Sequence, residues 1–210
     1  MSQLDTKTKI LDVAEELFAS KGYRGTSMRA ITSRAEVNLA AVNYHFGSKQ
    51  GLVTEVIERR LVPLNRLREQ NLNAVREKAA KIKKIPELES VLLAFVEPTL
   101  MLPESAPGAS NFITLISRAM ADTDQTARQI FVRNMKPTLT LFYGCLAEAL
   151  PELSRDVLYW RLNFVIGALS HTMRAIDKCP VPMEEGVPHD SRSLVKLLLP
   201  FIRAGMEARL

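Results

Sequence analysis

TSMRAITSRAEVNLAAVNYHFGSK, residues 26–49, is the stretch of this chain that decides its fold. Thr26 and Ser27 offer hydroxyl groups that can cap the start of a helix, and Asn38 is an equally good cap for a second one. Gly47 ends the second helix. The pattern predicts two short helices, over 26–34 and 39–45, joined by a turn at 35–37. Two short helices joined by a tight turn, with a basic bias, predict a helix-turn-helix.

The second helix of such a unit lies in the major groove of DNA, where its N-terminal residues touch base edges. Val42 and Phe46 are four residues apart and are expected to pack against Ile31 and Ala35 of the first helix. This packing turns four residues outward: Leu39, Ala40, Asn43 and Tyr44. A leucine next to an alanine gains nothing from facing water, whereas both suit contact with thymine methyl groups.

Other polar side chains of this stretch suit either bases or phosphates. Asn43 can pair bidentately with adenine, and Arg29 can do so with guanine. Lys49 and three hydroxyl groups suit phosphate oxygens; the hydroxyls belong to Thr26, Ser27 and Tyr44. The amide end of the helix that follows Thr26 also attracts a phosphate.

The rest of the chain shows helical periodicity almost everywhere and few strand signals, which predicts an all-α fold. The first helix is expected over 6–21, with Ile10, Ala14, Leu17 and Phe18 on its buried face and Gly22 after its end. A helix starts after Ser48, and Pro63 is expected to bend or end it, although the basic stretch to Lys84 continues helically. Further helices are expected over 88–96, 110–121, 124–150, 154–177 and 191–208, with an irregular segment at 98–108, a kink near Pro137 and a loop with Pro180, Pro182 and Pro188.

Three spaced motifs within residues 10–56 resemble the DNA-binding domain of TetR-type repressors. They are Phe18-x-x-x-Gly22-Tyr23-x-x-Thr26-Ser27, Ile31-x-x-x-Ala35-x-Val37 and Tyr44-His45-Phe46-x-x-Lys49-x-x-Leu52. The resemblance implies an all-α homodimer: three N-terminal helices bind DNA, a fourth connects, and the C-terminal helices form a ligand pocket and a four-helix dimer interface. It also implies that a small molecule releases the protein from its operator. Carried over by position, the DNA-contacting residues are Arg29, Leu39, Ala40, Ala41, Asn43, Tyr44, His45 and Lys49.

Two residues depart from that family pattern. Glu36 stands where glycine is common in the turn, and a left-handed backbone is unfavourable for any residue other than glycine. The sequence therefore leaves open a turn of different shape. Asn43 stands where tyrosine is common, which favours base reading over phosphate contact at this position.

A narrower resemblance, to a PsrA-like, fatty-acid-responsive branch of the family, covers residues 37–49. Similar placement extends to residues farther along the chain: Phe131, Tyr159-Trp160-Arg161, Gly167-Ala168, Pro200-Phe201 and Gly205-Met206. This branch implies a long acyl chain as the effector.

Aromatic, apolar and a few polar residues of the C-terminal helices are candidates to line an apolar ligand cavity. They are Phe112, Leu115, Ile116, Arg118, Met120, Phe131, Phe142, Trp160, Phe164 and His171. Each apolar member is also compatible with a place in the core. Arg118 can receive a carboxylate, and a salt bridge or a solvated edge explains it equally well.

Two further apolar stripes are more than one chain can easily bury, so we assign them to a homodimer interface. They are Leu158, Leu162, Val165 and Leu169 on one helix, and Leu194, Leu197, Leu198, Phe201 and Ile202 on the last helix. A two-fold dimer predicts an inverted-repeat operator, with recognition helices about 34 Å apart or a multiple of it.

Composition and motif content limit the other classes of function. The chain has 28 basic and 23 acidic residues, three histidines and two cysteines. It contains no serine-hydrolase elbow, metal-ligand spacing or glycine-rich phosphate loop, so we expect neither an enzyme nor a cofactor or metal. No apolar run is long enough to span a membrane, so we expect no membrane partner, and the N-terminus lacks a secretion signal. Two cysteines form no disulfide framework, which favours the cytoplasm.

The sequence thus predicts a DNA-binding domain over residues 1–50 and a ligand-binding and dimerisation domain over 51–210. The expected partners are a double-stranded DNA operator, a small apolar effector and a second copy of the chain. Three alternatives stay open: a non-acyl hydrophobic effector that controls an efflux or catabolic operon, a helical ligand carrier without DNA function, and activation in place of repression. The basic run over 59–84 is read as a solvated helix face, with attraction to DNA as its alternative.

Overall fold

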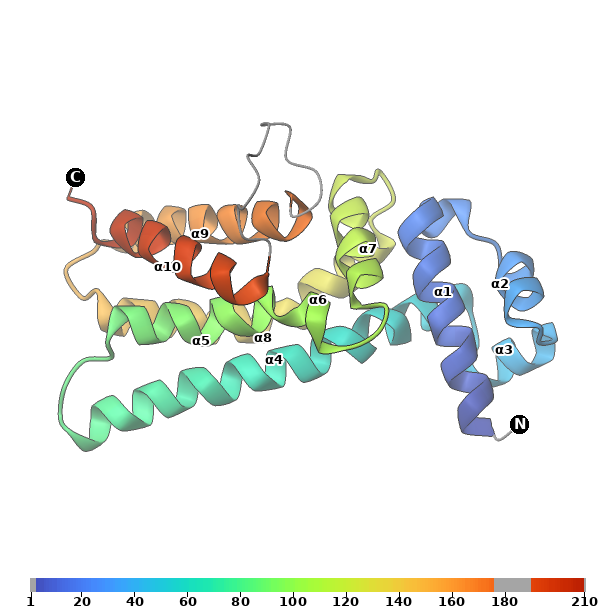
Figure 1. The fold of residues 1–210 in the computed structure, drawn as a ribbon, viewed down its shortest axis with the longest axis horizontal. Coiled ribbons are helices and arrows are strands. Elements are labelled where there is room, and N and C mark those ends of the chain that lie inside the picture. The colour runs from blue at the N-terminus through green and yellow to red at the C-terminus, as the bar shows by residue number, and fades with distance from the viewer. Residues whose placement is uncertain (1–2, 176–189, 210) are drawn as a thin grey trace. The chain divides into compact units, whose positions relative to one another are not determined.

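The computed structural model describes residues 3–175 and 190–209, which form helices and no strand (Figure 1). The all-α prediction is confirmed. The helices are α1 (Gln3–Gly25), α2 (Met28–Ala35), α3 (Leu39–Phe46), α4 (Lys49–Lys81), α5 (Leu88–Leu100), α6 (Leu102–Ser105), α7 (Ala109–Ala121), α8 (Thr126–Ala149), α9 (Arg155–Ala175) and α10 (Ser191–Glu207). Cys179, His189 and the expected loop with Pro180, Pro182 and Pro188 lie outside the described residues.

These helices form two compact units. The first contains Met1–Pro63 and Ser105–Met135, and the second contains Leu64–Glu104 and Lys136–Leu210. The unit boundaries follow packing, whereas the division at residue 50 was drawn from the DNA-binding motif. That division stays a prediction about function.

In the first unit, α1 packs against α2, α3 and α7. The apolar face predicted for α1 is buried: Ile10, Ala14, Leu17 and Phe18 are at most 3% exposed. From α7, the side chains of Phe112, Leu115 and Ala119 are buried as well. Helix α7 therefore shares one core with the apolar face of α1.

Gly22 interrupts the regular helix of α1 with a left-handed φ of 75°. Glycine adopts this conformation without steric cost. The helix end predicted at residue 22 is therefore confirmed as a break in the regular helix, and the chain continues helically beyond it to Gly25. The hydroxyl of Thr26 lies 2.8 Å from the carbonyl oxygen of Gly22 and 3.0 Å from that of Leu17. Thr26 is 1% exposed, and its hydroxyl thus satisfies carbonyl groups at this break.

Prolines end fewer helices than the sequence predicts. Pro63 does not end α4, which continues to Lys81, and Pro98 lies inside α5. Part of the segment expected to be irregular forms the short helix α6. A proline removes one backbone hydrogen bond, and buried residues on both sides of Pro63, such as Leu61 and Leu64, favour a continuous helix.

In the second unit, α5 packs against α9 and α10. The rings of Phe95 and Phe142 stack with centroids 4.3 Å apart. The guanidinium of Arg68 lies 4.5 Å from the centroid of the Phe95 ring and donates hydrogen bonds to Thr99 Oγ1 (2.6 Å) and Asn65 Oδ1 (2.9 Å). Burial lowers the pKa of Arg68 to about 9, so the group is still protonated at neutral pH.

None of the helices in the described ranges is long and apolar enough to cross a bilayer.

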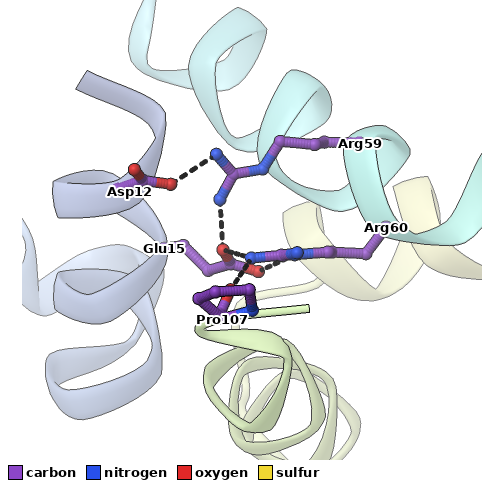
Figure 2. A network of polar contacts seen from close by, with 5 residues as sticks. All are labelled: Asp12, Glu15, Arg59, Arg60 and Pro107. Atoms are coloured by element: carbon purple, nitrogen blue, oxygen red, sulfur yellow. Dashed lines mark hydrogen bonds and ion pairs between the residues drawn. The ribbon is translucent and has the colours of Figure 1, made fainter. Parts of the chain in front are cut away.

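A buried carboxylate holds α1 to α4 in the first unit (Figure 2). Glu15 of α1 is 2% exposed. Its Oε1 accepts a hydrogen bond from Arg60 Nε (3.0 Å), and its Oε2 accepts one from Arg60 Nη2 (2.9 Å) and another from Arg59. Arg59 also binds Asp12 Oδ1 at 2.7 Å. Arg60 Nη2 donates in addition to the carbonyl of Pro107 (2.8 Å), so the same network reaches the turn before α7.

The residue that follows Pro107 is a glycine, which suits the close approach of this turn to Arg60. Gly108 has a φ of 77°, a left-handed conformation that side chains rarely adopt. A Cβ atom at this position would lie 3.3 Å from Arg60 Nη2. Gly108 therefore lets the turn approach the arginine closely.

We expect Glu15→Gln to lower the free energy of unfolding by about 3 kcal/mol, because removing one partner of a buried ion pair leaves the other charges uncompensated. Denaturant unfolding followed by circular dichroism measures this change. Glu16→Gln is the matched control, since the ion pair of Glu16 with Arg34 is about half exposed and is expected to contribute less than about 1 kcal/mol. Equal losses in the two variants would contradict the role of burial.

Candidate functional site

Side-chain caps fix the ends of the helix-turn-helix. Ser27 Oγ accepts a hydrogen bond from the N–H of Ala30 at 3.1 Å, and Asn38 Oδ1 accepts one from the N–H of Ala41 at 2.7 Å. Ser48 Oγ accepts one from the N–H of Gly51 at 3.0 Å, at the start of α4. The caps predicted at Ser27 and Asn38 are confirmed, and Ser48 is a further one. Each satisfies an amide that a helix start otherwise leaves unpaired.

The two faces of α3 are those that the sequence predicts. Val42 and Phe46 are buried, as are Ile31 and Ala35 of α2, against which α3 packs. The outward face is formed by four exposed residues: Leu39, Ala40, Asn43 and Tyr44. Leu39 is 46% exposed and Tyr44 is 75% exposed. The structure therefore presents an apolar pair, an amide and a phenol together on one surface.

The turn between α2 and α3 is left-handed at Glu36, with a φ of 51° and a ψ of 45°. The sequence left the shape of this turn open, because Glu36 stands where glycine is common, and the structure shows that Glu36 itself adopts the left-handed conformation. The N–H of Glu36 donates to the carbonyl of Ser33 (3.3 Å) and the N–H of Val37 to that of Thr32 (3.0 Å), which is the Schellman pattern of a helix end. A hydrogen bond of 2.8 Å from Lys9 Nζ, together with the positive charge of Lys9, lowers the pKa of the Glu36 carboxyl.

Of the three basic residues in 26–49, the structure places Arg34 in an ion pair with Glu16, while Arg29 and Lys49 have none within the described chain. Arg29 is exposed. Lys49 Nζ lies 4.4 Å from the centroid of the Tyr23 ring, and partial burial lowers the pKa of Lys49 against the opposing effect of Asp124. Nothing in the spacing of the sequence indicated this contact with Tyr23.

The remaining residues predicted to touch DNA lie in different environments. Ala41 and His45 are half-buried on α3, and Ser27 is exposed at the start of α2. Thr26 is separated from this group, because its buried hydroxyl is engaged by carbonyls of α1. A buried threonine next to a glycine break cannot be distinguished from an exposed cap by sequence alone.

The ten residues predicted to bind ligand are divided between the two units. Six belong to the first unit: Phe112, Leu115, Ile116, Arg118, Met120 and Phe131. Phe112 and Leu115 are part of the core there, and Arg118 lies beside Gly22 of α1. Four belong to the second unit: Phe142, Trp160, Phe164 and His171. Phe142 is fully buried, whereas the other three are exposed. The set is therefore divided between the two units.

The two apolar stripes of α9 are placed the other way round from the expectation. The stripe predicted for the dimer interface is buried inside the chain: Leu158, Leu162, Val165 and Leu169 are at most 7% exposed. The stripe predicted for ligand is exposed, with Trp160 at 60% and Phe164 at 68%. Periodicity identifies both stripes, but which one faces inward is decided by packing against α5 and α10.

Helix α10 adds to this exposed apolar surface. Leu197 and Phe201 are 60% and 70% exposed, Leu194 and Leu198 are half-buried, and Ile202 is buried. A groove of about 280 Å³ runs between α9 and α10, lined by residues that include Phe164, Ala168, Phe201 and Gly205. Arg161, buried on α9, donates to the carbonyls of Met206 and Ala208 and so ties the two helices together.

Comparison with known proteins gives two family matches and several related structures. Residues 10–56 match the model of bacterial regulatory proteins of the tetR family, and residues 93–205 match the tetracyclin repressor-like C-terminal domain. The HTH-type transcriptional repressor KstR2 of Rhodococcus jostii is 37% identical over 51 residues, which are 24% of this chain and 25% of that protein. The match thus spans about a quarter of the length of this curated relative.

Two solved structures share the fold along most of their length. The TetR family transcriptional regulator PfmR of Thermus thermophilus has a TM-score of 0.62 and 17% identity, with 96% of this chain and 98% of that chain covered. The transcriptional regulator FadR of Bacillus subtilis, solved in complex with stearoyl-CoA, has a TM-score of 0.68 and 15% identity, with 94% and 98% covered. The first family model covers the helix-turn-helix, and the C-terminal model by itself covers slightly more than half of the chain. This protein therefore belongs to the TetR family of bacterial regulatory proteins.

Proposed function

We propose that this protein is a homodimeric transcriptional repressor of the cytoplasm, which binds an inverted-repeat operator and leaves it when a small apolar effector binds. The observation that carries the proposal is the exposed face of α3. Its leucine, alanine and asparagine are held outward by the buried Val42 and Phe46. Such a surface has no benefit in water and suits base edges in a major groove.

Base reading and phosphate contact fall to different residues in this proposal. Asn43 and Arg29 are exposed and have the donor and acceptor groups that pair with adenine and guanine. Leu39 and Ala40 contact thymine methyl groups. Phosphate contacts come from Ser27, Tyr44 and Lys49, with Ala41 and His45 next to them on α3. Thr26 supports this surface from the inside, through its bonds to carbonyls of α1.

The dimer forms through the exposed face of α9 and α10. Large apolar side chains gather there: Tyr159, Trp160, Phe164, Leu197 and Phe201, each at least 55% exposed. A second copy that presents the same surface removes these side chains from water, and the two-fold symmetry pairs each helix with its equivalent. Clusters of exposed aromatic side chains are typical of interfaces.

The effector is a long-chain fatty acid or its CoA ester. The FadR structure in complex with stearoyl-CoA shows that a protein of this fold takes an acyl-CoA, and the 37–49 motif resembles the fatty-acid-responsive branch. The second candidate is a non-acyl hydrophobic compound. Repression is proposed because KstR2, a repressor, matches the DNA-binding part of this chain.

Asn43→Ala should relax base preference at one operator position by about 1–3 kcal/mol, because it removes an amide that reads a base edge. Binding to operator duplexes substituted one base pair at a time measures this effect. Lys49→Ala is the contrasting variant: it should weaken binding to every duplex equally and lower the salt slope by about 1. If Asn43→Ala weakens binding to all duplexes alike, the base-reading role is wrong.

Phe201→Glu should raise the dissociation constant of the dimer at least about 30-fold, the equivalent of a 2 kcal/mol interface residue. Sedimentation equilibrium of the full chain measures it. Leu67→Glu is the control, since Leu67 is an exposed apolar residue of α4 in the same unit, with 46% of its surface accessible. Unchanged dimerisation of Phe201→Glu, or equal loss in both variants, would contradict this interface.

The whole proposal is tested by binding to DNA fragments that flank the protein's own gene, with and without palmitoyl-CoA or free palmitate. We expect one fragment to bind specifically and to be released by an acyl ligand. Specific binding that acyl ligands leave unchanged but a non-acyl hydrophobic compound abolishes would select the second candidate. Failure to bind any duplex recovered by genome-wide selection at low salt would overturn the DNA-binding function.

A further inference from the structure

The turn between α4 and α5 carries a concentrated positive charge together with exposed apolar side chains. Residues 78–85 read KAAKIKKI, with four lysines, two isoleucines and no acidic residue. All six residues from 80 to 85 are exposed, and so is Lys78. Ile82 is 58% exposed and Ile85 is 62% exposed. We call this segment the lysine turn.

The lysines of this turn, together with the separate Arg66, are the exposed residues of the basic run over 59–84 that form no ion pair within the described ranges. Arg59 and Arg60 bind Glu15, Arg68 is buried, and Arg76 is paired with Glu148, with Arg76 Nε 3.0 Å from Glu148 Oε2. By contrast, no ion pair within the described ranges involves the four lysines: Lys78, Lys81, Lys83 and Lys84. Their charge is therefore available to an external anion.

The backbone of the lysine turn is fixed and not merely a loose connection. The N–H of Lys83 donates to the carbonyl of Ala80, and the N–H of Lys84 to that of Ala79, both at 3.0 Å. These are the two bonds of a Schellman helix end. Lys83 has a left-handed φ of 52°, at a position where glycine is preferred. In such a helix end an apolar residue commonly follows the left-handed one and packs back on the helix, but a lysine occupies that place here.

The isoleucines distinguish between the polyanions that this charge could attract. Duplex DNA is contacted through phosphates by Lys and Arg, and two isoleucines beside those lysines add nothing to that contact. An anionic bilayer takes up both kinds of side chain: lysines bind the headgroups, while isoleucines enter the boundary with the acyl chains. The combination therefore matches a membrane surface better than a nucleic acid.

We propose that the lysine turn docks this protein on anionic phospholipid membranes, with the four lysines at the headgroups and Ile82 and Ile85 inserted between them. The contact is peripheral. The expectation of no membrane partner rested on the lack of an apolar span, which concerns insertion of a helix and not contact with headgroups. The docking is reversible, since a single short segment of this kind supplies a modest, salt-sensitive attraction.

The test is vesicle co-sedimentation of the purified full chain at low salt. We expect partition into vesicles of phosphatidylethanolamine and phosphatidylglycerol, and little into pure phosphatidylcholine. Each lysine near an anionic surface multiplies the partition coefficient about fivefold. Replacing Lys78, Lys81, Lys83 and Lys84 by glutamine should therefore lower partition by more than about a hundredfold. Ile82→Ser with Ile85→Ser should lower it by about tenfold, because two side chains lose their burial.

The matched control removes four charges elsewhere, at exposed positions without an ion pair in the described chain: Arg66, Arg128, Lys136 and Arg192 replaced by glutamine. This variant should partition within about twofold to fivefold of the unchanged protein. Equal loss in the control would mean that net charge alone drives binding and would overturn the proposal. Full vesicle binding of the double isoleucine variant would also overturn the proposal. The same holds if the four-lysine variant loses as much affinity for non-specific duplex DNA as it loses for vesicles. Specific operator binding should be unaffected by all three variants, so the result does not depend on the DNA-binding proposal.

Discussion

Glu15 is a carboxylate that the fold has removed from water, and the charges of Arg59 and Arg60 compensate it there. Those two arginines come from α4, and one of them also binds the Pro107 carbonyl before α7 (Figure 2). Since α1 packs against α2 and α3, the orientation of the exposed α3 face depends on a helix held at its middle by this network. A change that displaces either arginine would leave the buried carboxylate with fewer compensating charges.

The same geometry bears on how the proposed effector would act on the helix-turn-helix. Residues 93–205 match the C-terminal domain model of the family, yet α7, within that range, packs on α1 in the first unit. Arg24 of α1 also pairs with Asp124 after α7, at 3.1 Å. An effector acts only by binding one arrangement better than another. A ligand that favours a different position of α7 therefore has a direct route to α1, through side chains already in contact.

Much of the candidate DNA-binding surface was predictable because its determinants are local. Caps at Ser27 and Asn38 depend on neighbouring amides, and the i, i+4 spacing of Val42 and Phe46 sets which side of α3 is buried. The faces of α9 were not predictable. That helix has two apolar stripes, and only its contacts with α5 and α10 decide that Leu158 is inside and Trp160 outside. Pro63 was expected to bend or end its helix, with the basic stretch to Lys84 continuing helically, and α4 does continue through it, since packing outweighs one lost hydrogen bond.

The basic run in α4 shows why net charge alone says little about function. An excess of basic residues over 59–84 predicts one solvated face, but the structure divides these residues by their environment. Arg59 and Arg60 neutralise a buried carboxylate, and Arg68 is stacked on an aromatic ring in another core. Burial makes each of these charges dependent on its neighbours, so none of them is free to attract an external partner. Only charges that remain in water can act at a distance, and in this helix they are concentrated toward its C-terminal end.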